Sequence, residues 1–272
     1  MPELPEVETT RRGIAPHVCG RRVTRIDVYD SRLRWPVPAD IDARTRGATI
    51  ERVDRRSKYL LFRLGATTIV VHLGMTGTLR VFAPGTAPPR GAHDHVDVVL
   101  DDGTLLRYRD PRRFGAMLFA HDERAQRLLD VLGPEPFDAA FDAHYLWRAT
   151  RTRSAPIKLA LMDNSLVCGV GNIYANEALF RAGIRPGVRA NRLSRARLSR
   201  LVEAVREVLA LAIATGGSTL RDYVGSDGSA GYFQLEYFVY GRAGEACRIC
   251  GTPIRLARLG GRASYHCPRC QR

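Results

Sequence analysis

Hydrophobic and polar residues follow two different periods along this 272-residue chain. Between residues 23 and 119, short runs rich in Val, Leu, Thr and Tyr are separated by turn residues, most clearly at 59–64, 67–73 and 96–100. Such runs are typical of β-strands, and the Asp-Asp-Gly sequence at 101–103 favours a hairpin turn after the last of them. The pattern therefore predicts a β-sandwich or barrel in this half of the chain.

A helical pattern occurs on both sides of the predicted strands. Pro5 and the acidic residues around it suit the first turn of a helix, which we expect to run to about Gly13. Between residues 198 and 213 apolar residues recur at a spacing near 3.6, with Ser194 placed to cap the start and Gly216 placed to end the helix. We expect this long helix to pack in a core.

A Pro- and Gly-rich stretch, Leu-Gly-Pro-Glu-Pro at residues 132–136, interrupts the pattern between the strands and the long helix. Such a stretch favours a linker, and the length of the chain allows two domains or more. We expect a multidomain α+β protein. Its parts are an N-terminal β-sandwich domain with flanking helices over 1–131, a helical domain over 132–240 and a cysteine-bearing tail over 241–272.

The chain is strongly basic, with 42 Lys and Arg residues against 28 Asp and Glu residues. Residues 148–272 hold 20 of the basic and only 8 of the acidic side chains, so the positive surplus lies in the helical half. Surplus positive charge attracts and holds polyanions, most often nucleic acid. A proteome biased toward arginine is the alternative explanation, because 40 of the 42 basic residues are arginine.

The two lysines, Lys58 and Lys158, are the exceptions in this arginine-rich chain. A lysine ammonium can be tuned to share a proton, whereas a guanidinium stays protonated. The two positions are therefore candidates for chemistry, although chance retention would give the same count.

No apolar run approaches the ~18 residues that a membrane-spanning helix requires. The first residues are acidic and contain proline, rather than being basic and then apolar as in a secretory signal. We therefore expect a cytoplasmic protein without a membrane partner. The composition, 45% hydrophobic and 26% charged, also excludes a disordered chain.

Four of the six cysteines form two C-x2-C pairs separated by 16 residues: Cys247 and Cys250, then Cys267 and Cys270. This spacing predicts four thiolates around one structural Zn2+, and a cytoplasmic location disfavours the alternative of two disulfides. The remaining Cys19 and Cys168 are expected to be ordinary buried residues. No acidic residue occurs from 246 to 272, so the tail is a ribbon of positive charge suited to a phosphate backbone.

A glycine-containing segment at 164–174 lies between two predicted helical segments, one ending near Asp163 and one covering 174–181. Gly169, Gly171 and Asn172 can adopt positive φ angles and present backbone N–H groups to an anion at the start of the second helix. A plain turn between helices is the alternative.

Pro2 is notable because a small second residue usually allows Met1 to be removed, which leaves a secondary amine next to Glu3. An α-amine with a pKa near ~8 is neutral at pH 7 far more often than a lysine with a pKa of ~10.4, so it needs less tuning to act as a nucleophile. An incidental N-terminus is the alternative.

Several separated motifs resemble those of bacterial formamidopyrimidine-DNA glycosylase, in the same order and over essentially the whole chain. They are Pro-Glu-Leu-Pro-Glu-Val-Glu-Thr at 2–9, Ser-Lys-Tyr-Leu-Leu at 57–61, His-Leu-Gly-Met-Thr-Gly at 72–77, Asp-Pro-Arg-Arg-Phe-Gly at 110–115, the glycine turn at 169–174 and the four-cysteine tail. The resemblance implies an N-terminal β-sandwich, a helix-two-turn-helix DNA-binding domain and a four-cysteine zinc finger.

The resemblance also implies a function. Family members remove oxidised purines such as 8-oxoguanine and formamidopyrimidines from double-stranded DNA, preferably opposite cytosine, and then act as a lyase at the abasic site. The chain is thus expected to be a monomeric hydrolase and lyase of base excision repair, located in the bacterial cytoplasm with the nucleoid, with one Zn2+ as its cofactor.

Four positions match the catalytic residues of that family. The resemblance makes the Pro2 nitrogen the nucleophile that forms a Schiff base with the sugar, and it makes Glu3 the general acid and base there. It assigns Lys58 to proton donation during β-elimination and Arg262 to δ-elimination. Because arginine is a poor proton donor, we expect Arg262 to position a phosphate instead.

Seven further positions match DNA contacts of the family. Met75, Arg112 and Phe114 correspond to the trio that fills the void left by the extruded nucleotide, although the hydrophobic pattern alone would place Met75 and Phe114 in the core. The positions that correspond to backbone contacts are His93, Arg153, Lys158 and Asn172. The Gly- and Ser-rich segment at 218–232 corresponds to the loop that covers the flipped base.

Two rival functions stay open at this point. An endonuclease VIII-type enzyme would share the fold and the amine but prefer oxidised pyrimidines, and the Leu4-Pro5 opening with the trio of Met75, Arg112 and Phe114 favours the purine enzyme. A non-catalytic zinc-ribbon DNA-binding protein is the rival from another class.

Overall fold

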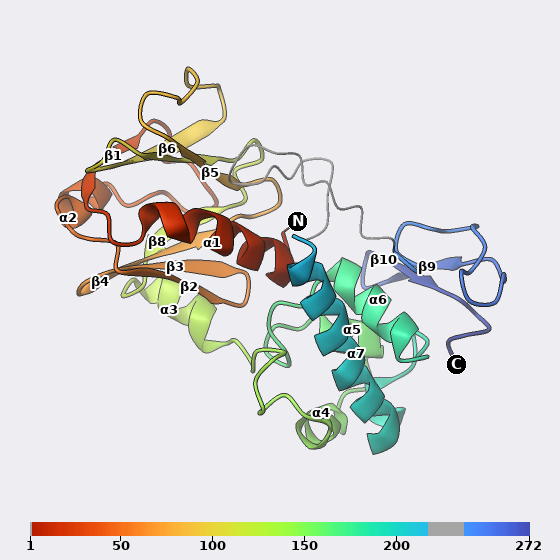
Figure 1. The fold of residues 1–272 in the computed structure, drawn as a ribbon. Coiled ribbons are helices and arrows are strands. Elements are labelled where there is room, and N and C mark those ends of the chain that lie inside the picture. Colours follow the sequence, from red (N-terminus) through yellow and green to blue (C-terminus); the bar gives the residue numbers. More distant parts are fainter. Residues whose placement is uncertain (1, 217–236) are drawn as a thin grey trace. The chain divides into compact units, whose positions relative to one another are not determined.

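The structure is a computed structural model that describes residues 2–216 and 237–272 (Figure 1). The described residues form two compact units, one reaching Asp130 and the other comprising Val131–Thr215 and residues 237–272. The expected loop at 218–232 lies outside the described residues. None of the helices in the described ranges combines the length and the apolar character that crossing a bilayer needs.

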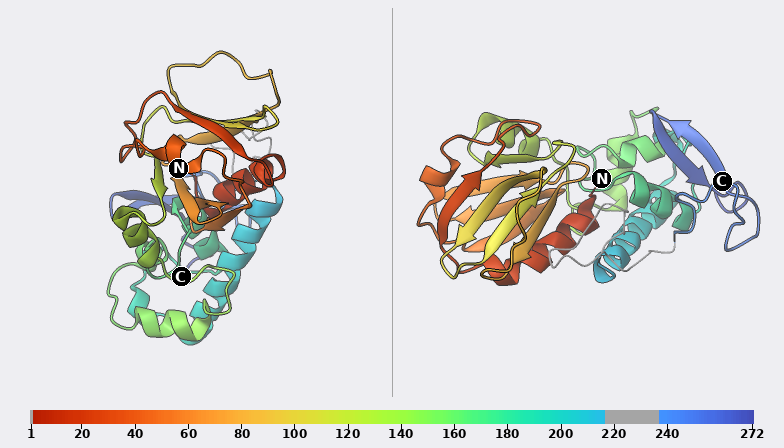
Figure 2. Two further views of the ribbon diagram at one scale, coloured as in Figure 1. Left: turned by 90° about the vertical axis from the view of Figure 1, so that its left-hand side faces the viewer. Right: turned by 90° about the horizontal axis from the view of Figure 1, so that it is seen from above.

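The first unit is a sandwich of two four-stranded antiparallel sheets (Figure 2). One sheet has the order β1-β6-β7-β5, formed by β1 (Val23–Val28), β6 (Asp94–Leu100), β7 (Leu105–Arg109) and β5 (Thr78–Phe82). The other has the order β2-β3-β4-β8, formed by β2 (Arg52–Arg56), β3 (Tyr59–Leu64), β4 (Thr67–His72) and β8 (Ala116–Phe119). The predicted sandwich is confirmed, as is the β6–β7 hairpin, whose Gly103 has φ +84°.

Alternating side chains of both sheets meet in one apolar core. Ile26 and Leu106 enter it from one sheet and Phe62, Val71 and Met117 from the other. A small apolar cavity of about 20 Å³ lies among these side chains. The core is therefore closely packed and provides a rigid support for the loops at the sheet ends.

Three helices, α1 (Leu4–Val18), α2 (Ile41–Thr45) and α3 (Glu123–Asp130), flank the sandwich. Helix α1 begins as predicted but continues five residues beyond Gly13. Ile14 and Val18 are fully buried on the same face as Val7, and they pack against the sandwich core. Burial of these side chains stabilises the helix by more than Gly13 destabilises it, so the helix does not end at this glycine as predicted.

The second unit is helical and carries a two-stranded ribbon. Its helices are α4 (Ala143–Thr150), α5 (Ile157–Leu161), α6 (Asn172–Arg181), the short 3-10 helix η1 (Ala190–Arg192) and α7 (Arg195–Ala214). Its strands are β9 (Arg255–Leu259) and β10 (Arg262–His266), which pair antiparallel. Helix α7 is confirmed together with its cap, because Ser194 Oγ accepts the backbone N–H of Arg197 at 3.4 Å.

A buried ion pair joins two neighbouring strands of the sandwich. The Arg107 guanidinium on β7 donates to both carboxylate oxygens of Asp97 on β6 at 2.8 Å each, and its Nη1 donates to the carbonyl of Pro88 at 2.9 Å. Both charged side chains are almost completely buried. The pair therefore ties the segment after β5 to the sheet.

Removing one partner should leave an uncompensated buried charge. We expect Arg107→Met to lower the free energy of unfolding by about 3–5 kcal/mol. Arg25→Met is the matched control, since Arg25 forms an exposed pair with Asp27 on the same sheet, and it should cost less than about 1 kcal/mol. Urea unfolding of both variants checks this, and equal losses would contradict it.

Candidate active site and zinc centre

The N-terminus is held at the start of α1. Pro2 is buried, and Glu3, the residue before the helix, is only 2% exposed. Glu6 Oε2 accepts the backbone N–H of Glu3 at 2.8 Å as part of a capping box, and Pro5 occupies the first turn. A chain end normally frays, so this cap gives Pro2 and Glu3 a defined place.

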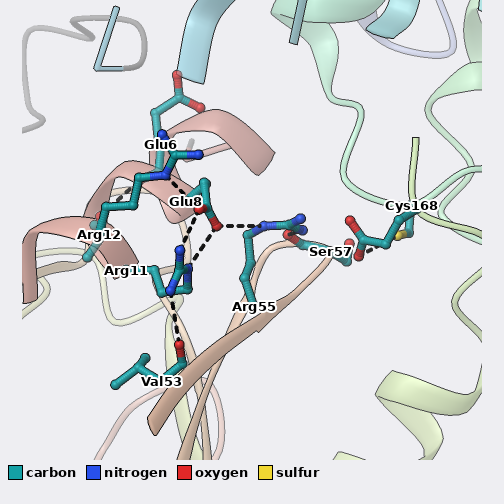
Figure 3. Close-up of polar contacts among 10 residues, drawn as sticks. Glu6, Glu8, Arg11, Arg12, Val53, Arg55, Ser57 and Cys168 are labelled. Atoms are coloured by element: carbon teal, nitrogen blue, oxygen red, sulfur yellow. Dashed lines mark hydrogen bonds and ion pairs between the residues drawn. The ribbon is translucent and has the colours of Figure 1, made fainter. Parts of the chain in front are cut away.

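The Glu8 carboxylate joins α1 to the neighbouring β2 (Figure 3). It accepts hydrogen bonds from Arg11 (2.8 and 3.0 Å), from Arg12 (2.8 Å) and from Arg55 on β2 (3.3 Å). Burial opposes ionisation of Glu8, but the hydrogen bonds from Arg11 and Arg12 outweigh it and lower the pKa of the carboxyl. Arg11 Nη1 also donates to the carbonyl of Val53 at 3.3 Å.

Lys58 lies in the tight turn between β2 and β3, three residues after Arg55. Its side chain is 7% exposed. The preceding Ser57 has φ +56°, and its carbonyl accepts a hydrogen bond from Arg55 Nη1 at 2.9 Å. The same arginine thus contacts both the Lys58 turn and α1, so the lysine and the N-terminal helix are held by one connected set of side chains.

His72, at the end of β4, has a pKa lowered to about 4. Burial of most of its ring is the main cause, and the nearby positive charges of Lys58 and Arg34 add to it. His72 Nδ1 accepts the backbone N–H of Gly74 at 3.1 Å, and the ring lies 5.0 Å from that of Tyr59. His72 is therefore neutral at pH 7 and adds no positive charge beside Lys58.

Met75 and Phe114 are 37% and 45% exposed, so the interpretation of these residues as core, which rests on pattern alone, is wrong. They occupy the loops after β4 and before β8, and the Arg112 guanidinium lies 4.9 Å from the centre of the Phe114 ring. Arg112 is itself exposed, whereas His93 is half-buried. Exposed apolar side chains beside an arginine are suited to contact with stacked bases.

Lys158 is completely buried in the second unit. Its Nζ donates to the Ala263 carbonyl at 2.6 Å and to Ser264 Oγ at 2.7 Å, so it joins α5 to β10. Arg262, the first residue of β10, is exposed. The structure thus gives Lys158 a direct role in holding the strand on which Arg262 lies.

The glycine turn leads from α5 to α6. Gly169 has φ +87° and Gly171 caps α6, which begins at Asn172, two residues earlier than predicted. Asn172 Oδ1 is buried and has no hydrogen-bond partner among the described residues. Nearby, Arg153 pairs with Asp163 at 2.5 Å.

The four cysteines of the tail converge, with all four sulfur atoms within 4.8 Å of one another. The Sγ–Sγ distances are 3.5 Å for Cys250 to Cys267 and to Cys270, and 3.9 Å for Cys247 to Cys270. Tetrahedral thiolates about 2.3 Å from one Zn2+ would lie about 3.8 Å apart, so the cluster fits zinc. All six cysteines lie within the described ranges and none of them forms a disulfide there; Cys168 is buried as expected, and Cys19 is only half-buried.

The ribbon around this cluster is uniformly positive. Six of its arginines are exposed: Arg248, Arg255, Arg258, Arg262, Arg269 and Arg272. The strands also dock on α6, because Asn176 Oδ1 accepts the backbone N–H of Tyr265 at 2.8 Å. The cysteine cluster is therefore a scaffold that fixes a cationic surface.

Two buried acidic residues that organise the main chain were not singled out from the sequence. Glu177 on α6 accepts three backbone N–H groups at 2.8–3.0 Å, those of Phe238, Val239 and Tyr240. Asp110, within the Asp-Pro-Arg-Arg-Phe-Gly motif, is completely buried. The sequence offered one signal for each: Glu177 lies within an apolar helix, and Asp110 lies directly after a strand. A carboxylate at such a buried position requires several hydrogen-bond donors, which points to a structural role.

Three family models match the chain. Residues 1–117 match the formamidopyrimidine-DNA glycosylase N-terminal domain, residues 132–224 match its H2TH domain, and residues 244–272 match the zinc finger found in FPG and IleRS. Together with the cysteine cluster, the last match supports one structural zinc ion.

Relatives match over the full length of the chain. The formamidopyrimidine-DNA glycosylases of Stutzerimonas stutzeri and Burkholderia multivorans are 57% and 58% identical to it, with 100% of each chain covered. The structure of the MutM (Fpg) protein from Thermus thermophilus is similar with a TM-score of 0.87 at 42% identity, covering 99% of this chain and 98% of that one.

Lactococcus lactis Fpg bound to DNA containing an abasic site is similar with a TM-score of 0.88 at 34% identity, with 100% of both chains covered. These matches extend across both units and the cysteine tail, and they agree with the arrangement of sandwich, helices and ribbon. The chain therefore belongs to the formamidopyrimidine-DNA glycosylase family of base-excision-repair enzymes.

Proposed function

We propose that this chain removes oxidised purines, such as 8-oxoguanine and formamidopyrimidines, from double-stranded DNA and then cleaves the strand by β,δ-elimination. The observation that carries the proposal is the placement of Pro2 and Glu3, both buried at the capped start of α1, in a chain that matches the family over its whole length. Further proposals are that it acts as a monomer in the cytoplasm and associates with the nucleoid.

In this mechanism the Pro2 nitrogen attacks C1′ of the damaged nucleoside. A nitrogen–carbon bond forms, and the bond between C1′ and the base breaks. The nitrogen gives up its proton, and its lone pair then opens the sugar ring: the C1′–O4′ bond breaks, O4′ takes up a proton, and a positively charged iminium forms at C1′. This iminium withdraws electrons and acidifies the neighbouring sugar carbon. Glu3, the next residue in the chain, serves as acid and base at the sugar.

Lys58 supplies a proton during β-elimination. Its burial and its place in the turn after Arg55, which also bonds to Glu8 on α1, support this assignment because they hold the ammonium in a defined position. Arg262 is assigned to the δ-elimination step through positioning of a phosphate, for which its exposed place on β10 is suited.

DNA binding is proposed to use both units. Met75, Arg112 and Phe114 would fill the void left by the extruded nucleotide, and Arg112 would hydrogen-bond the orphaned cytosine. The proposed backbone contacts are His93, Arg153, Lys158 and Asn172. Lys158 is completely buried and its Nζ bonds to β10, so a phosphate contact would require this side chain to become accessible on DNA binding.

The zinc finger is proposed to comprise residues 241–272, after a sandwich domain at 1–131 and a helical domain at 132–240. Cys247, Cys250, Cys267 and Cys270 would hold the ion, which supplies folding energy rather than catalysis because a closed four-thiolate site has no open position. The arginines of the ribbon would then face the phosphate backbone.

Borohydride trapping on an 8-oxoguanine:cytosine duplex tests the nucleophile. N-terminal mass measurement should first confirm that Met1 is absent, because a retained Met1 would block the amine. We expect the processed protein to form a covalent adduct and Pro2→Gly to trap at least tenfold more slowly, since a primary amine gives a less effective iminium. Pro5→Ala, the matched proline control within α1, should trap normally. Absence of an adduct with the processed protein would refute the lyase assignment.

Comparison of lesions separates this proposal from the endonuclease VIII-type alternative. We expect faster release of 8-oxoguanine than of thymine glycol from otherwise identical duplexes, because the Met75, Arg112 and Phe114 trio suits the purine enzyme. Single-turnover assays measure both rates. Faster release of thymine glycol would overturn the choice of substrate.

Loss of the zinc should weaken DNA binding through phosphate contacts. We expect Cys250→Ser to reduce the bound zinc and to make the negative slope of log K against log salt shallower by about 0.9 for each phosphate contact that is lost. Cys19→Ser should keep both zinc and slope. Metal analysis and binding titrations between low and moderate salt measure these quantities, and an unchanged slope in a zinc-free variant would contradict the prediction.

The lowered pKa of His72 also predicts an acid sensitivity. Below pH 6.5 the unfolded chain binds a proton at this position, whereas the folded protein does not until about pH 4. The free energy of unfolding should therefore fall as the pH drops through this window, and His72 should account for about 2–3 kcal/mol of this loss by pH 4.5. His72→Asn retains an acceptor for Gly74 and should lose less stability between pH 7 and 4.5 in urea unfolding. Equal losses would disprove the assignment.

A further inference from the structure

Asp110 is the first residue of one of two neighbouring loops that carry the exposed Met75, Arg112 and Phe114. We call residues 73–77 and 110–115 the wedge loops. The Asp110 side chain has no exposed surface, although the side chains around it on these loops reach the solvent. A completely buried carboxylate is costly unless several donors surround it, so its contacts indicate what it does.

The carboxylate bonds to both wedge loops at once. Oδ1 accepts the hydroxyl of Thr76 at 2.7 Å, and Thr76 is the residue directly after Met75. Oδ2 accepts the backbone N–H of Gly115 at 2.8 Å, and Gly115 is the residue directly after Phe114. The backbone N–H of Arg112 lies 3.3 Å from both Asp110 Oδ1 and Thr76 Oγ1. Met75 and Phe114 thus each directly precede a residue that bonds to the Asp110 carboxylate, and Arg112 contacts the carboxylate through its own backbone N–H.

The main chain of Asp110 is itself fixed to the sandwich. Its carbonyl lies 2.8 Å from Nε2 of the buried His95, and its N–H donates to the carbonyl of His93 at 3.0 Å. Tyr108, one of the largest fully buried side chains, has its hydroxyl 3.4 Å from Asp110 Oδ2. The carboxylate therefore has a rigid base on β6 and β7.

The wedge loops also approach each other too closely for larger residues. Gly74 has φ +62°, and a Cβ there would lie 2.4 Å from the Gly115 nitrogen. A Cβ on Gly115 would lie 1.7 Å from the Tyr108 hydroxyl. Such tight contact leaves no room for intervening side chains, so the loops are connected by the hydrogen bonds that meet at the Asp110 carboxylate and the Thr76 hydroxyl.

We propose that Asp110 is a positioning residue that makes the Met75 loop and the Arg112–Phe114 loop one preformed wedge. This inference rests on the proposed role of the trio in filling the void in the duplex. Inserting side chains between bases costs stacking energy, and ordering two independent loops at that moment would add a further entropic cost. Because Asp110 already joins the loops in the free protein, their ordering takes place during folding, and its entropic cost does not arise when the protein binds DNA.

Thr76 offers the sharpest test, because its hydroxyl is the link between the loops. Thr76→Val removes this hydroxyl with little change in shape, whereas Thr76→Ser keeps it. Two single-turnover rates are measured: excision of 8-oxoguanine from a duplex, and strand cleavage at a preformed abasic site in single-stranded DNA. The second substrate has no stacked duplex to enter and no orphaned base.

We expect Thr76→Val to slow duplex excision about three- to tenfold, the equivalent of one hydrogen bond, and to leave single-strand cleavage within about twofold. Thr76→Ser should restore the duplex rate. Asp110→Asn should have a larger effect on the duplex rate, since it replaces one acceptor with a donor that faces other donors. If Asp110→Asn fails to fold, the Thr76 pair still decides.

Phe114→Ala separates failure of this inference from failure of the proposed wedge. If Phe114→Ala does not slow duplex excision, the wedge itself is refuted and the inference falls with it. If Phe114→Ala slows excision but folded Thr76→Val matches the wild type, only the positioning role of the Asp110 link is refuted. Equal slowing of duplex and single-strand reactions by Thr76→Val would indicate a general structural effect and would also overturn the inference.

Discussion

The N-terminal helix of this protein is fixed to the sandwich by the ion pair between Glu8 on α1 and Arg55 on β2. The proposed nucleophile, the Pro2 nitrogen, needs such a tie, because a free chain end is normally mobile. The capping box orders the first turn of α1, the Glu8 carboxylate fixes that helix to the sheet, and Arg55 extends the connection to the Ser57 carbonyl beside Lys58. The amine and the lysine thus share one support.

Buried carboxylates repeatedly hold backbone N–H groups in this chain. Glu6 holds the N–H of Glu3, Asp110 holds that of Gly115, and Glu177 holds three consecutive N–H groups after the segment outside the described residues. Each is a fixed acceptor that positions a segment without forming part of a sheet. Because a buried charge seldom adds stability over an apolar residue, their value lies in specifying one loop conformation.

The sequence predicted the elements whose signals are local. Strand β3 was predicted at its observed limits, and Ser194 caps α7, since period and capping chemistry are readable from neighbouring residues. The burial of Lys158 and the exposure of Phe114 were not readable from local pattern. Both depend on partners distant in the chain, such as Ala263 for Lys158, and such contacts leave no periodic signature.

Two groups of arginines in this chain have different roles. The arginines of the zinc ribbon are exposed and lie on a segment without acidic residues from 246 to 272, so their field is available to a phosphate backbone. Those beside α1 are instead bound to the buried Glu8 carboxylate, so their charge is neutralised within the protein. The same arginine-rich composition therefore serves two purposes, because an arginine paired with a buried carboxylate fixes one element to another, whereas an exposed arginine without acidic neighbours keeps its charge available to a phosphate.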